Sequence, residues 1–203
     1  MKNFRNHLME SNREKYYQEQ HQEWKDTPHQ RSPIAVGWLD GRQNQTKRFQ
    51  TLLDIGVQEG DSILDLGCGL GHMVEHLEKI GLNVRYTGID TNKWSIQQAY
   101  QFREATYIHG SIFDIQDKYD WGLASGVFNI EFPKLEMLET INELLSKSNK
   151  GIAFNLLSSS ANNSLKYENY TPEEIVSHLK GDVSVVENYG VENDFTIYIK
   201  KEK

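Results

Sequence analysis

The sequence is poor in residues that cross-link or interrupt a chain, with one cysteine, Cys68, and four prolines among 203 residues. A single cysteine excludes a disulfide within the chain and is typical of a reducing compartment, so we expect a cytoplasmic protein. No apolar run approaches the roughly 20 residues that span a membrane, and the polar N-terminus lacks the pattern of a secretory signal. We therefore expect one globular domain with an appended segment and no membrane partner.

Basic residues are scarce outside the N-terminal quarter of the chain. Residues 1–50 carry nine Lys and Arg against six Asp and Glu, whereas residues 51–203 carry thirteen against twenty-three. Binding to a nucleic acid backbone requires a basic face. The acidic body argues against a nucleic acid partner, while the N-terminal segment is either a site for an anionic ligand or a solvated surface.

Strand-like and helical segments alternate from residue 44 to the C-terminus. Short apolar runs that predict buried strands are separated by amphipathic helices, and two adjacent runs at 183–190 and 194–201 predict a terminal hairpin. The stretch "TPEEIVSHLKG", residues 171–181, predicts a helix with Thr171 as N-cap. This alternation predicts an α/β fold with a mostly parallel sheet covered on both faces. We expect residues 44–203 to form this domain and residues 1–43 to form a separate segment with one or two weak helices and a loop.

Three glycines lie between the first predicted strand and its helix, in "SILDLGCGLGHMVEHL" over residues 62–77. This crevice at the carboxyl end of a parallel strand is where such sheets bind ligands. The glycine spacing is one residue tighter than the G-x-G-x-x-G pattern of dinucleotide sites. Asp65, just before the glycines, would repel a pyrophosphate but suits a cationic ammonium group. Asp90, at the end of the next strand, can accept hydrogen bonds from both hydroxyls of a ribose.

A ribose and a cationic amino acid end together describe S-adenosylmethionine. The stretches "ILDLGCGLG", "YTGID", "IHGSIFDI" and "YDWGLASGVFN" resemble the successive motifs of class I S-adenosylmethionine-dependent methyltransferases, over roughly residues 44–200. The resemblance implies a Rossmann-like three-layer sandwich whose seven-stranded sheet has the order 3-2-1-4-5-7-6, with strand 7 antiparallel. It also implies S-adenosylmethionine as cofactor and S-adenosylhomocysteine as product.

The family's roles transfer to matching positions of this sequence. The glycine loop and Asp65 would serve the amino acid end of the cofactor, Asp90 the ribose, and the two residues after it the adenine. Ser111 departs from the pattern, since many members have an acidic residue there that reads the adenine amino group. The candidate cofactor-binding residues are Asp65, Gly67, Cys68, Gly69, Gly71, Asp90, Thr91, Asn92, Ser111, Ile112, Ser125, Trp38 and Arg48.

The segment "PIAVGWLDGRQNQTKRF", residues 33–49, resembles a lid found in some small bacterial methyltransferases. In that interpretation Trp38 covers the pocket, and Gln45 or Arg48 reaches the cofactor carboxylate, which an arginine fork suits. The structural alternatives are an apolar plug for Trp38 and a solvated helix face for Arg48. Tyr16 and Tyr17 are further lid candidates.

No catalytic signature stands out. Methyl transfer from a sulfonium needs alignment and exclusion of water, and a base only when the nucleophile must lose a proton. His29, Asn129 and Tyr189 are weak catalytic candidates, with a surface, a turn and a packing role as the alternatives. Cys68 suits a small space-filling role better than that of a nucleophile. The dispersed histidines predict no metal site.

The function that we expect is methyl transfer to a small-molecule acceptor. The Asn/Asp-Pro-Pro-aromatic motif of amino-group methylases of nucleic acids is absent after the fourth strand, where the sequence reads "SGVFNIEFP". An RNA or protein methyltransferase and a non-catalytic S-adenosylmethionine-binding protein remain the alternatives. A dinucleotide-dependent oxidoreductase is disfavoured by the glycine spacing and by Asp65.

Overall fold

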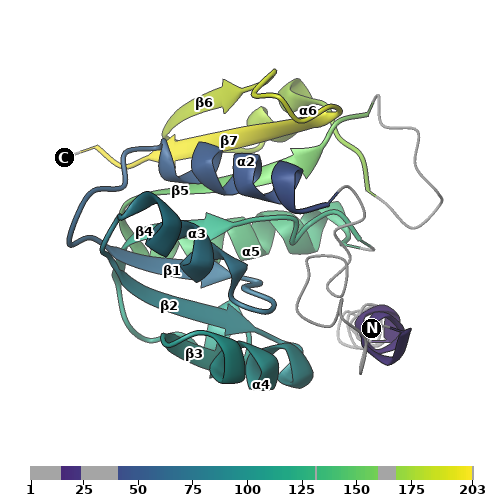
Figure 1. Cartoon of the computed structure of the whole chain (residues 1–203). Helices are drawn as coiled ribbons and strands as arrows, with labels where there is room; N and C mark the ends of the chain where they lie inside the picture. Colours follow the sequence, from purple (N-terminus) through teal and green to yellow (C-terminus); the bar gives the residue numbers. More distant parts are fainter. Residues whose placement is uncertain (1–14, 24–40, 131, 160–167, 203) are drawn as a thin grey trace.

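A seven-stranded sheet forms the centre of the computed structural model, which describes residues 15–23, 41–130, 132–159 and 168–202 (Figure 1). The strands are β1 (Ser62–Leu66), β2 (Arg85–Asp90), β3 (Thr106–His109), β4 (Tyr119–Ala124), β5 (Ser148–Leu157), β6 (Asp182–Val186) and β7 (Asp194–Lys200). Their order is β3-β2-β1-β4-β5-β7-β6, and β7 is antiparallel to both of its neighbours. The order and the antiparallel seventh strand confirm the predicted fold class.

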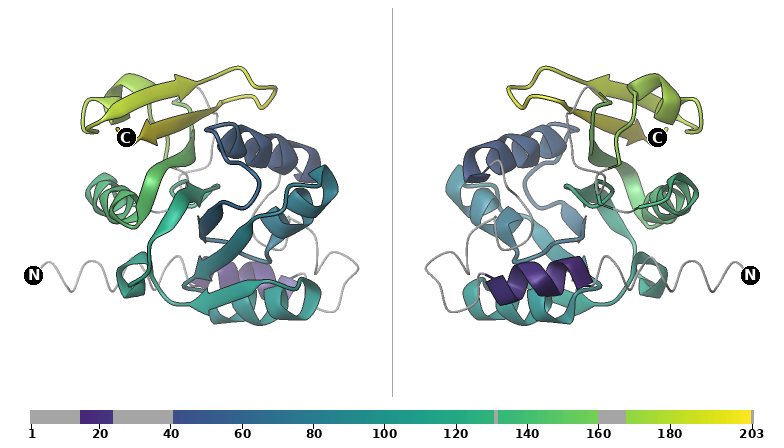
Figure 2. Two further views of the ribbon diagram at one scale, coloured as in Figure 1. Left: turned by 90° about the vertical axis from the view of Figure 1, so that its left-hand side faces the viewer. Right: turned by 90° about the vertical axis from the view of Figure 1, so that its right-hand side faces the viewer.

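Helices cover both faces of the sheet and make the structure three-layered. Figure 2 shows α2 and α3 on one side and α5 on the other. The helices are α2 (Gly41–Leu53), α3 (His72–Ile80), α4 (Lys93–Phe102), α5 (Lys134–Ser146) and α6 (Pro172–Val176), with a short 3-10 helix η2 (Ile112–Asp114) after β3. None of the described helices is long and apolar enough to cross a membrane.

The central strands are buried on both faces, which explains their continuous apolar runs. On β1, Ile63 packs with Leu52 of α2 and Met73 of α3, whereas its neighbour Leu64 packs with Ile141 of α5. Successive side chains of a strand point to opposite faces, so neighbouring apolar residues of β1 contribute to two different cores. The parallel strands point the same way, and the loops after β1, β2, β3 and β4 therefore meet at one edge.

Helix α6 is shorter than the sequence predicts. Its start is as expected, because the Thr171 hydroxyl accepts a hydrogen bond from the Glu174 backbone N–H at 3.2 Å. The helix ends at Val176 instead of near residue 181. The next backbone bonds, from His178 and Leu179, reach back only three residues, as in the tighter 3-10 geometry.

A further helix, residues 15–23, lies at the edge toward which β1 and β2 point (Figure 1). It contacts the start of α4, where the His21 ring lies 3.7 Å from the Trp94 ring, centroid to centroid, at an interplanar angle of 32°. This helix falls within residues 1–43, for which the sequence predicts one or two weak helices.

Candidate functional site

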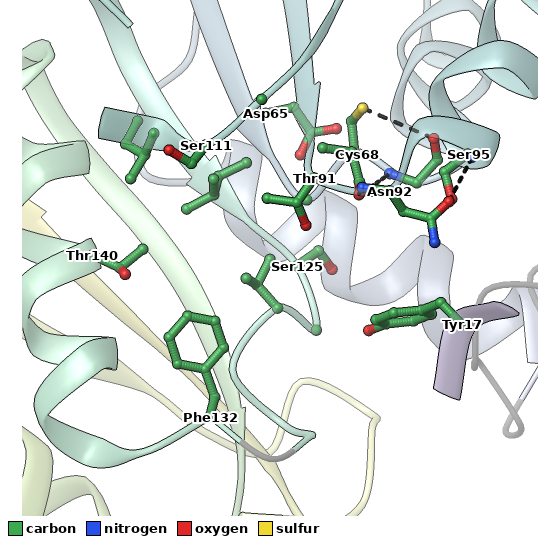
Figure 3. A pocket seen from close by; sticks show the side chains of 18 of the residues that line it. Tyr17, Asp65, Cys68, Thr91, Asn92, Ser95, Ser111, Ser125, Phe132 and Thr140 are labelled. Carbon is green, nitrogen blue, oxygen red and sulfur yellow. Dashed lines mark hydrogen bonds between the residues drawn. The ribbon is translucent and has the colours of Figure 1, made fainter. Parts of the chain in front are cut away.

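A cavity of about 410 Å³ opens where the loops after β1, β2, β3 and β4 meet (Figure 3). Most of the candidate cofactor-binding residues line it. Those residues are Asp65, Gly67, Cys68, Gly69, Asp90, Thr91, Asn92, Ser111, Ile112 and Ser125. The structure thus brings together side chains from four loops that are up to 60 positions apart in the sequence.

The glycine loop is tied to β2 and packs closely against the loop after β4. The backbone N–H groups of Gly67 and Cys68 both donate to the Ile89 carbonyl, at 2.8 and 3.1 Å. Gly67 has φ +68°, and a Cβ there would lie 2.6 Å from a methyl of Val127. Gly71 caps α3 with φ +73° and does not line the cavity, and a Cβ there would collide with the Tyr107 hydroxyl. The loop's own packing therefore requires glycine at both positions.

Asp90 holds the ends of two loops together. Its carboxylate accepts hydrogen bonds from the backbone N–H of Gly69 at 2.9 Å and of Asn92 at 2.8 Å, one on each oxygen. Burial is the largest influence on this group and raises its pKa. Each carboxylate oxygen has about two acceptor positions, so both retain capacity for a ribose hydroxyl. The site fits a ribose.

Asp65 lies at the bottom of the glycine loop and accepts a hydrogen bond of 2.6 Å from the Tyr86 hydroxyl. Burial raises the pKa of Asp65 to about 7, the negative charge of Asp90 adds to this rise, and the Tyr86 hydrogen bond opposes it. A buried carboxyl group of this kind ionises more readily when a cation binds beside it. The site therefore also fits an ammonium group.

Cys68 is a packed side chain with an unreactive thiol. Burial, together with the charges of Asp90 and Asp65, raises its pKa well above the ordinary value for a thiol. Gly88 on β2 leaves the space that Cys68 fills, since a Cβ at Gly88 would lie 2.8 Å from the Cys68 sulfur. The thiolate is the nucleophilic form, so this environment supports the space-filling role.

On the β3 side, Ser111 begins η2. Its backbone N–H and its hydroxyl both donate to the Asp114 carboxylate, at 2.8 and 3.1 Å, and these bonds lower the pKa of Asp114. Asp114 therefore serves as a helix cap. The Ser111 oxygen can still accept a hydrogen bond. The N–H of Ile112 begins the helix, where such groups have no partner within the helix.

Arg48 lies away from the cavity lining. Its Nε donates to the Asp194 carboxylate at 2.7 Å, and both side chains are buried. The guanidinium thus joins α2 to β7. The sequence had suggested a cofactor carboxylate as its partner. Gln45, the other residue considered for that role, does line the cavity and lies 3.4 Å from a ring nitrogen of His72.

The catalytic candidates do not line the cavity where the structure describes them. Asn129 is buried, and its side chain accepts a hydrogen bond from the Leu157 backbone N–H at 3.2 Å. Tyr189 donates its hydroxyl to Asp194, and burial raises its pKa. His29 and Trp38 lie outside the described residues.

Several lining residues were not candidates from the sequence. Tyr86 does not line the cavity but contacts Asp65, which does. The sequence gives no sign of this contact, because the two residues are on different strands. The additional lining residues include His72, Ser95, Phe113, Phe132, Glu136 and Thr140. Of these, Glu136 and Thr140 are four positions apart on α5, a helical spacing that the sequence shows. Within the described ranges, no group of three His, Cys, Asp or Glu side chains could hold a metal ion.

Comparison with known proteins agrees with this geometry. A family model described as a methyltransferase domain matches residues 57–194. The chain belongs to this methyltransferase family. The Mycobacterium tuberculosis protein Rv1506c, which is named as a methyltransferase, is 28% identical over 157 residues, covering 69% of this chain and 93% of that protein. The class I methyltransferase that the motifs predicted is confirmed.

Two further matches differ in what their names say they act on. The protein-lysine N-methyltransferase EFM4 of Saccharomyces cerevisiae is 30% identical over 111 residues, 51% of this chain and 48% of that protein. The magnesium protoporphyrin IX methyltransferase of Synechocystis PCC 6803, solved with bound SAH, superposes with a TM-score of 0.61 over 79% of this chain and 83% of that one. At 14% identity the second match concerns the fold alone.

Proposed function

We propose that this methyltransferase takes its methyl group from S-adenosylmethionine and transfers it to a small-molecule acceptor. The observation that carries the proposal is the pair of carboxylates that line the cavity beside the glycine loop, the buried Asp65 and the half-buried Asp90. An acidic residue before the loop is unfavourable for a pyrophosphate and favourable for an ammonium group. The solved relative with bound SAH supports the same donor.

In this proposal each loop binds one part of the donor. Asp65 binds the ammonium group, Asp90 the ribose hydroxyls, and Thr91 and Asn92 border the adenine opposite Ser111 and the Ile112 N–H. Ser125 lies on the side of the sulfonium. Gly67, Gly69 and Cys68 keep the loop backbone close to the ligand, and Gly71 sets the start of α3. When bound, the donor supplies an electrophilic methyl group, and the chain's residues align the acceptor and exclude water.

The N-terminal segment acts as a lid in this proposal, with residues 1–43 as the lid and residues 44–203 as the catalytic domain. Tyr17, in the helix of residues 15–23, lines the cavity. The contact between His21 and Trp94 supports the same placement of the helix. The acidic body of the chain disfavours a nucleic acid acceptor. The single cysteine favours a cytoplasmic location.

A protein acceptor is the second candidate, because the relative EFM4 is named as a protein-lysine methyltransferase. Methyl-label transfer to cell extract, separated into small molecules and macromolecules, distinguishes the two. Label in the small-molecule fraction supports the first candidate, and label on polypeptide supports the second.

Calorimetry tests the donor directly. We expect S-adenosylmethionine and S-adenosylhomocysteine to bind the purified protein and NAD not to bind. Tight binding of NAD without binding of either sulfur ligand would overturn the proposal.

A further inference from the structure

Strand β5 carries one polar side chain in an otherwise apolar buried run. Residues 151–156 read "GIAFNL", and the asparagine of this run, Asn155, is fully buried. Burial of an amide costs free energy unless hydrogen bonds inside the protein replace those to water. The Asn155 amide makes such bonds to the loop after β4, one to the Gly126 backbone and one to the Ser125 side chain. The amide therefore fixes this loop from below.

The chemistry of the two groups bonded to Asn155 determines which amide atom faces each of them. The Gly126 backbone N–H can only donate, so the amide atom at 2.8 Å from it is the oxygen, Oδ1. The other amide atom is then the nitrogen, Nδ2, which can only donate, and it lies 3.3 Å from the Ser125 hydroxyl oxygen. Ser125 is the acceptor of this bond, and its own proton points elsewhere.

The proton of the Ser125 hydroxyl is available to a ligand in the cavity. Ser125 is half-buried and lines the cavity (Figure 3). Among the residues that the structure describes, none accepts a hydrogen bond from this hydroxyl. A hydroxyl has one proton and two lone pairs, and the bond from Asn155 uses a lone pair. Ser125 therefore presents a hydrogen-bond donor to the cavity.

Ser125 lies beside the part of the cavity that is proposed for the amino acid end of S-adenosylmethionine. Strands β1 and β4 are paired up to Leu66 and Ala124, so the next residues, Gly67 and Ser125, follow adjacent strand ends. Asp65, which is proposed to bind the ammonium group, precedes Leu66. In an α-amino acid the carboxylate is bonded to the carbon that carries the ammonium group, so the carboxylate also lies in this part of the cavity.

A carboxylate in this part of the cavity meets few other hydrogen-bond donors. Among the lining residues that the structure describes there is no lysine or arginine. The backbone N–H groups of Gly67 and Cys68 donate to the Ile89 carbonyl, and that of Gly69 donates to Asp90. Carboxylates are generally held by arginine forks or by unpaired backbone N–H groups. A neutral hydroxyl with a fixed direction takes that role here.

We infer that Asn155 is a positioning residue, which holds the Ser125 hydroxyl as a hydrogen-bond donor to the carboxylate of S-adenosylmethionine. Asp65 then binds the ammonium group and Ser125 the carboxylate, so that separate side chains recognise the two charged groups of the amino acid end. This inference rests on the proposed function, since it assigns further residues to the binding of the same cofactor.

Two ligands that differ in one group test the inference. S-adenosylhomocysteine and its decarboxylated analogue, in which hydrogen replaces the carboxylate, are titrated by calorimetry into the full-length protein. Ser125→Ala should weaken binding of S-adenosylhomocysteine by about tenfold or more, the usual scale of a hydrogen bond to a charged group. Binding of the analogue should change by less than about twofold. A change in packing would weaken both ligands alike, so the ratio of the two affinities is the decisive measurement.

Asn155→Leu tests the positioning role, because it removes the amide at a similar volume and adds no charge. The Ser125 hydroxyl then remains but is no longer held in one direction. The ratio of affinities should fall, by less than in Ser125→Ala. Adding Asn155→Leu to Ser125→Ala should leave the ratio within about twofold of the single Ser125→Ala variant, because Asn155 acts through the hydroxyl. Ser125→Ala, at a half-buried position, still decides the carboxylate contact if Asn155→Leu does not fold.

Ser95→Ala is the matched control, since it makes the same chemical change at another side chain that lines the cavity. Ser95 lies on α4, which follows β2, and the ratio should not change. An unchanged ratio in Ser125→Ala or in a folded Asn155→Leu would overturn the inference. If Ser125→Ala left the ratio unchanged but slowed methyl transfer, the hydroxyl would be assigned to the acceptor. Failure of S-adenosylhomocysteine to bind the unaltered protein would overturn the proposed function instead, so the failures are distinguishable.

Discussion

At the scale of single residues, the site depends on carboxyl groups that the protein holds out of water. Asp65 is buried and Asp90 is half-buried, and removal from water raises the pKa of each. In the unliganded protein this burial disfavours ionisation of Asp65. The unfolded chain ionises the same group near pH 4, so the free energy of unfolding falls as the pH rises from about 4 toward 7. A bound cation offsets that cost, so the same arrangement that weakens the free protein favours a cationic ligand.

The first prediction concerns the pH dependence of donor binding. The ammonium group prefers the ionised Asp65, whose pKa is about 7. The affinity for S-adenosylhomocysteine should therefore fall as the pH drops below about 7, by up to about tenfold per pH unit. Calorimetry at a series of pH values from 5 to about 9 measures this profile.

Two variants identify the group responsible for the profile. Tyr86→Phe removes the hydrogen bond that lowers the pKa of Asp65, so the midpoint should move upward by about one pH unit or more. Asp65→Asn should flatten the profile, weaken binding, and raise the melting temperature of the unliganded protein at pH 8. A flat profile in the unaltered protein would show that Asp65 does not meet the ligand's charge.

The second prediction concerns Asp90. Asp90→Asn retains one acceptor oxygen but loses the charge, and it should weaken binding of S-adenosylhomocysteine by about 1–3 kcal/mol, the usual scale for hydrogen bonds to charged groups. The melting temperature, measured in parallel, separates lost binding from lost folding. Unchanged affinity in a folded variant would place the ribose elsewhere.

At the scale of elements, helix α2 is fixed by a buried ion pair. Arg48 on α2 contacts Asp194 at the start of β7, a residue 146 positions later in the chain. Asp194 also receives the Tyr189 hydroxyl. The side chains of α2 that line the cavity, Gln45 and Phe49, therefore depend on this contact for their position.

The third prediction follows from that ion pair. Arg48→Met leaves the Asp194 carboxylate buried without its charge partner and should lower the free energy of unfolding by about 3–5 kcal/mol. Adding Asp194→Asn should recover part of that loss. Urea unfolding measures both variants, and a loss of donor affinity with unchanged stability would instead assign Arg48 to the cofactor.

The fourth prediction concerns the N-terminal helix. Trp94→Ala removes the ring that His21 contacts and should weaken binding of S-adenosylhomocysteine without affecting the unfolding of the core. Deletion of residues 1–40 should have a larger effect in the same direction. Lys93→Ala, at an exposed neighbouring position of α4, is the matched control. A shortened protein with full affinity and activity would reject the lid.

At the scale of the whole molecule, the cavity joins loops from four strands, so a ligand that fills it should stabilise the entire fold. At a concentration of about 100 times its dissociation constant, a ligand that binds only the folded protein adds about 2.7 kcal/mol. For a chain of this size we expect S-adenosylhomocysteine to raise the melting temperature by roughly 5–10 °C. Differential scanning calorimetry checks this, with NAD expected to cause no shift.

Features of the molecule that have a local cause could be predicted from the sequence. The glycine loop and Asp90 could be placed because each follows an apolar strand, and parallel strands bring their carboxyl ends to one edge. The end of α6 was missed because the choice between α-helical and 3-10 bonds in a last turn has little signal in side-chain type. The sequence offers a cofactor carboxylate or solvent as the partner of Arg48, because it contains no sign of which distant carboxylate the guanidinium will contact.

The sequence by itself determined the family, the order of the elements and the edge of the sheet where the cofactor candidates gather, since periodicity and motif spacing are properties of neighbouring residues. Only the tertiary structure decided that the Tyr86 hydroxyl donates to Asp65 and lowers its pKa. It likewise decided that Arg48 pairs with Asp194 and that Glu136 lines the cavity. The physical reason is that the ionisation and contacts of a buried polar group depend on side chains brought together by folding. Most residues that line the cavity after β1 to β4 could therefore be predicted from the sequence, and the partners of its polar groups required the fold.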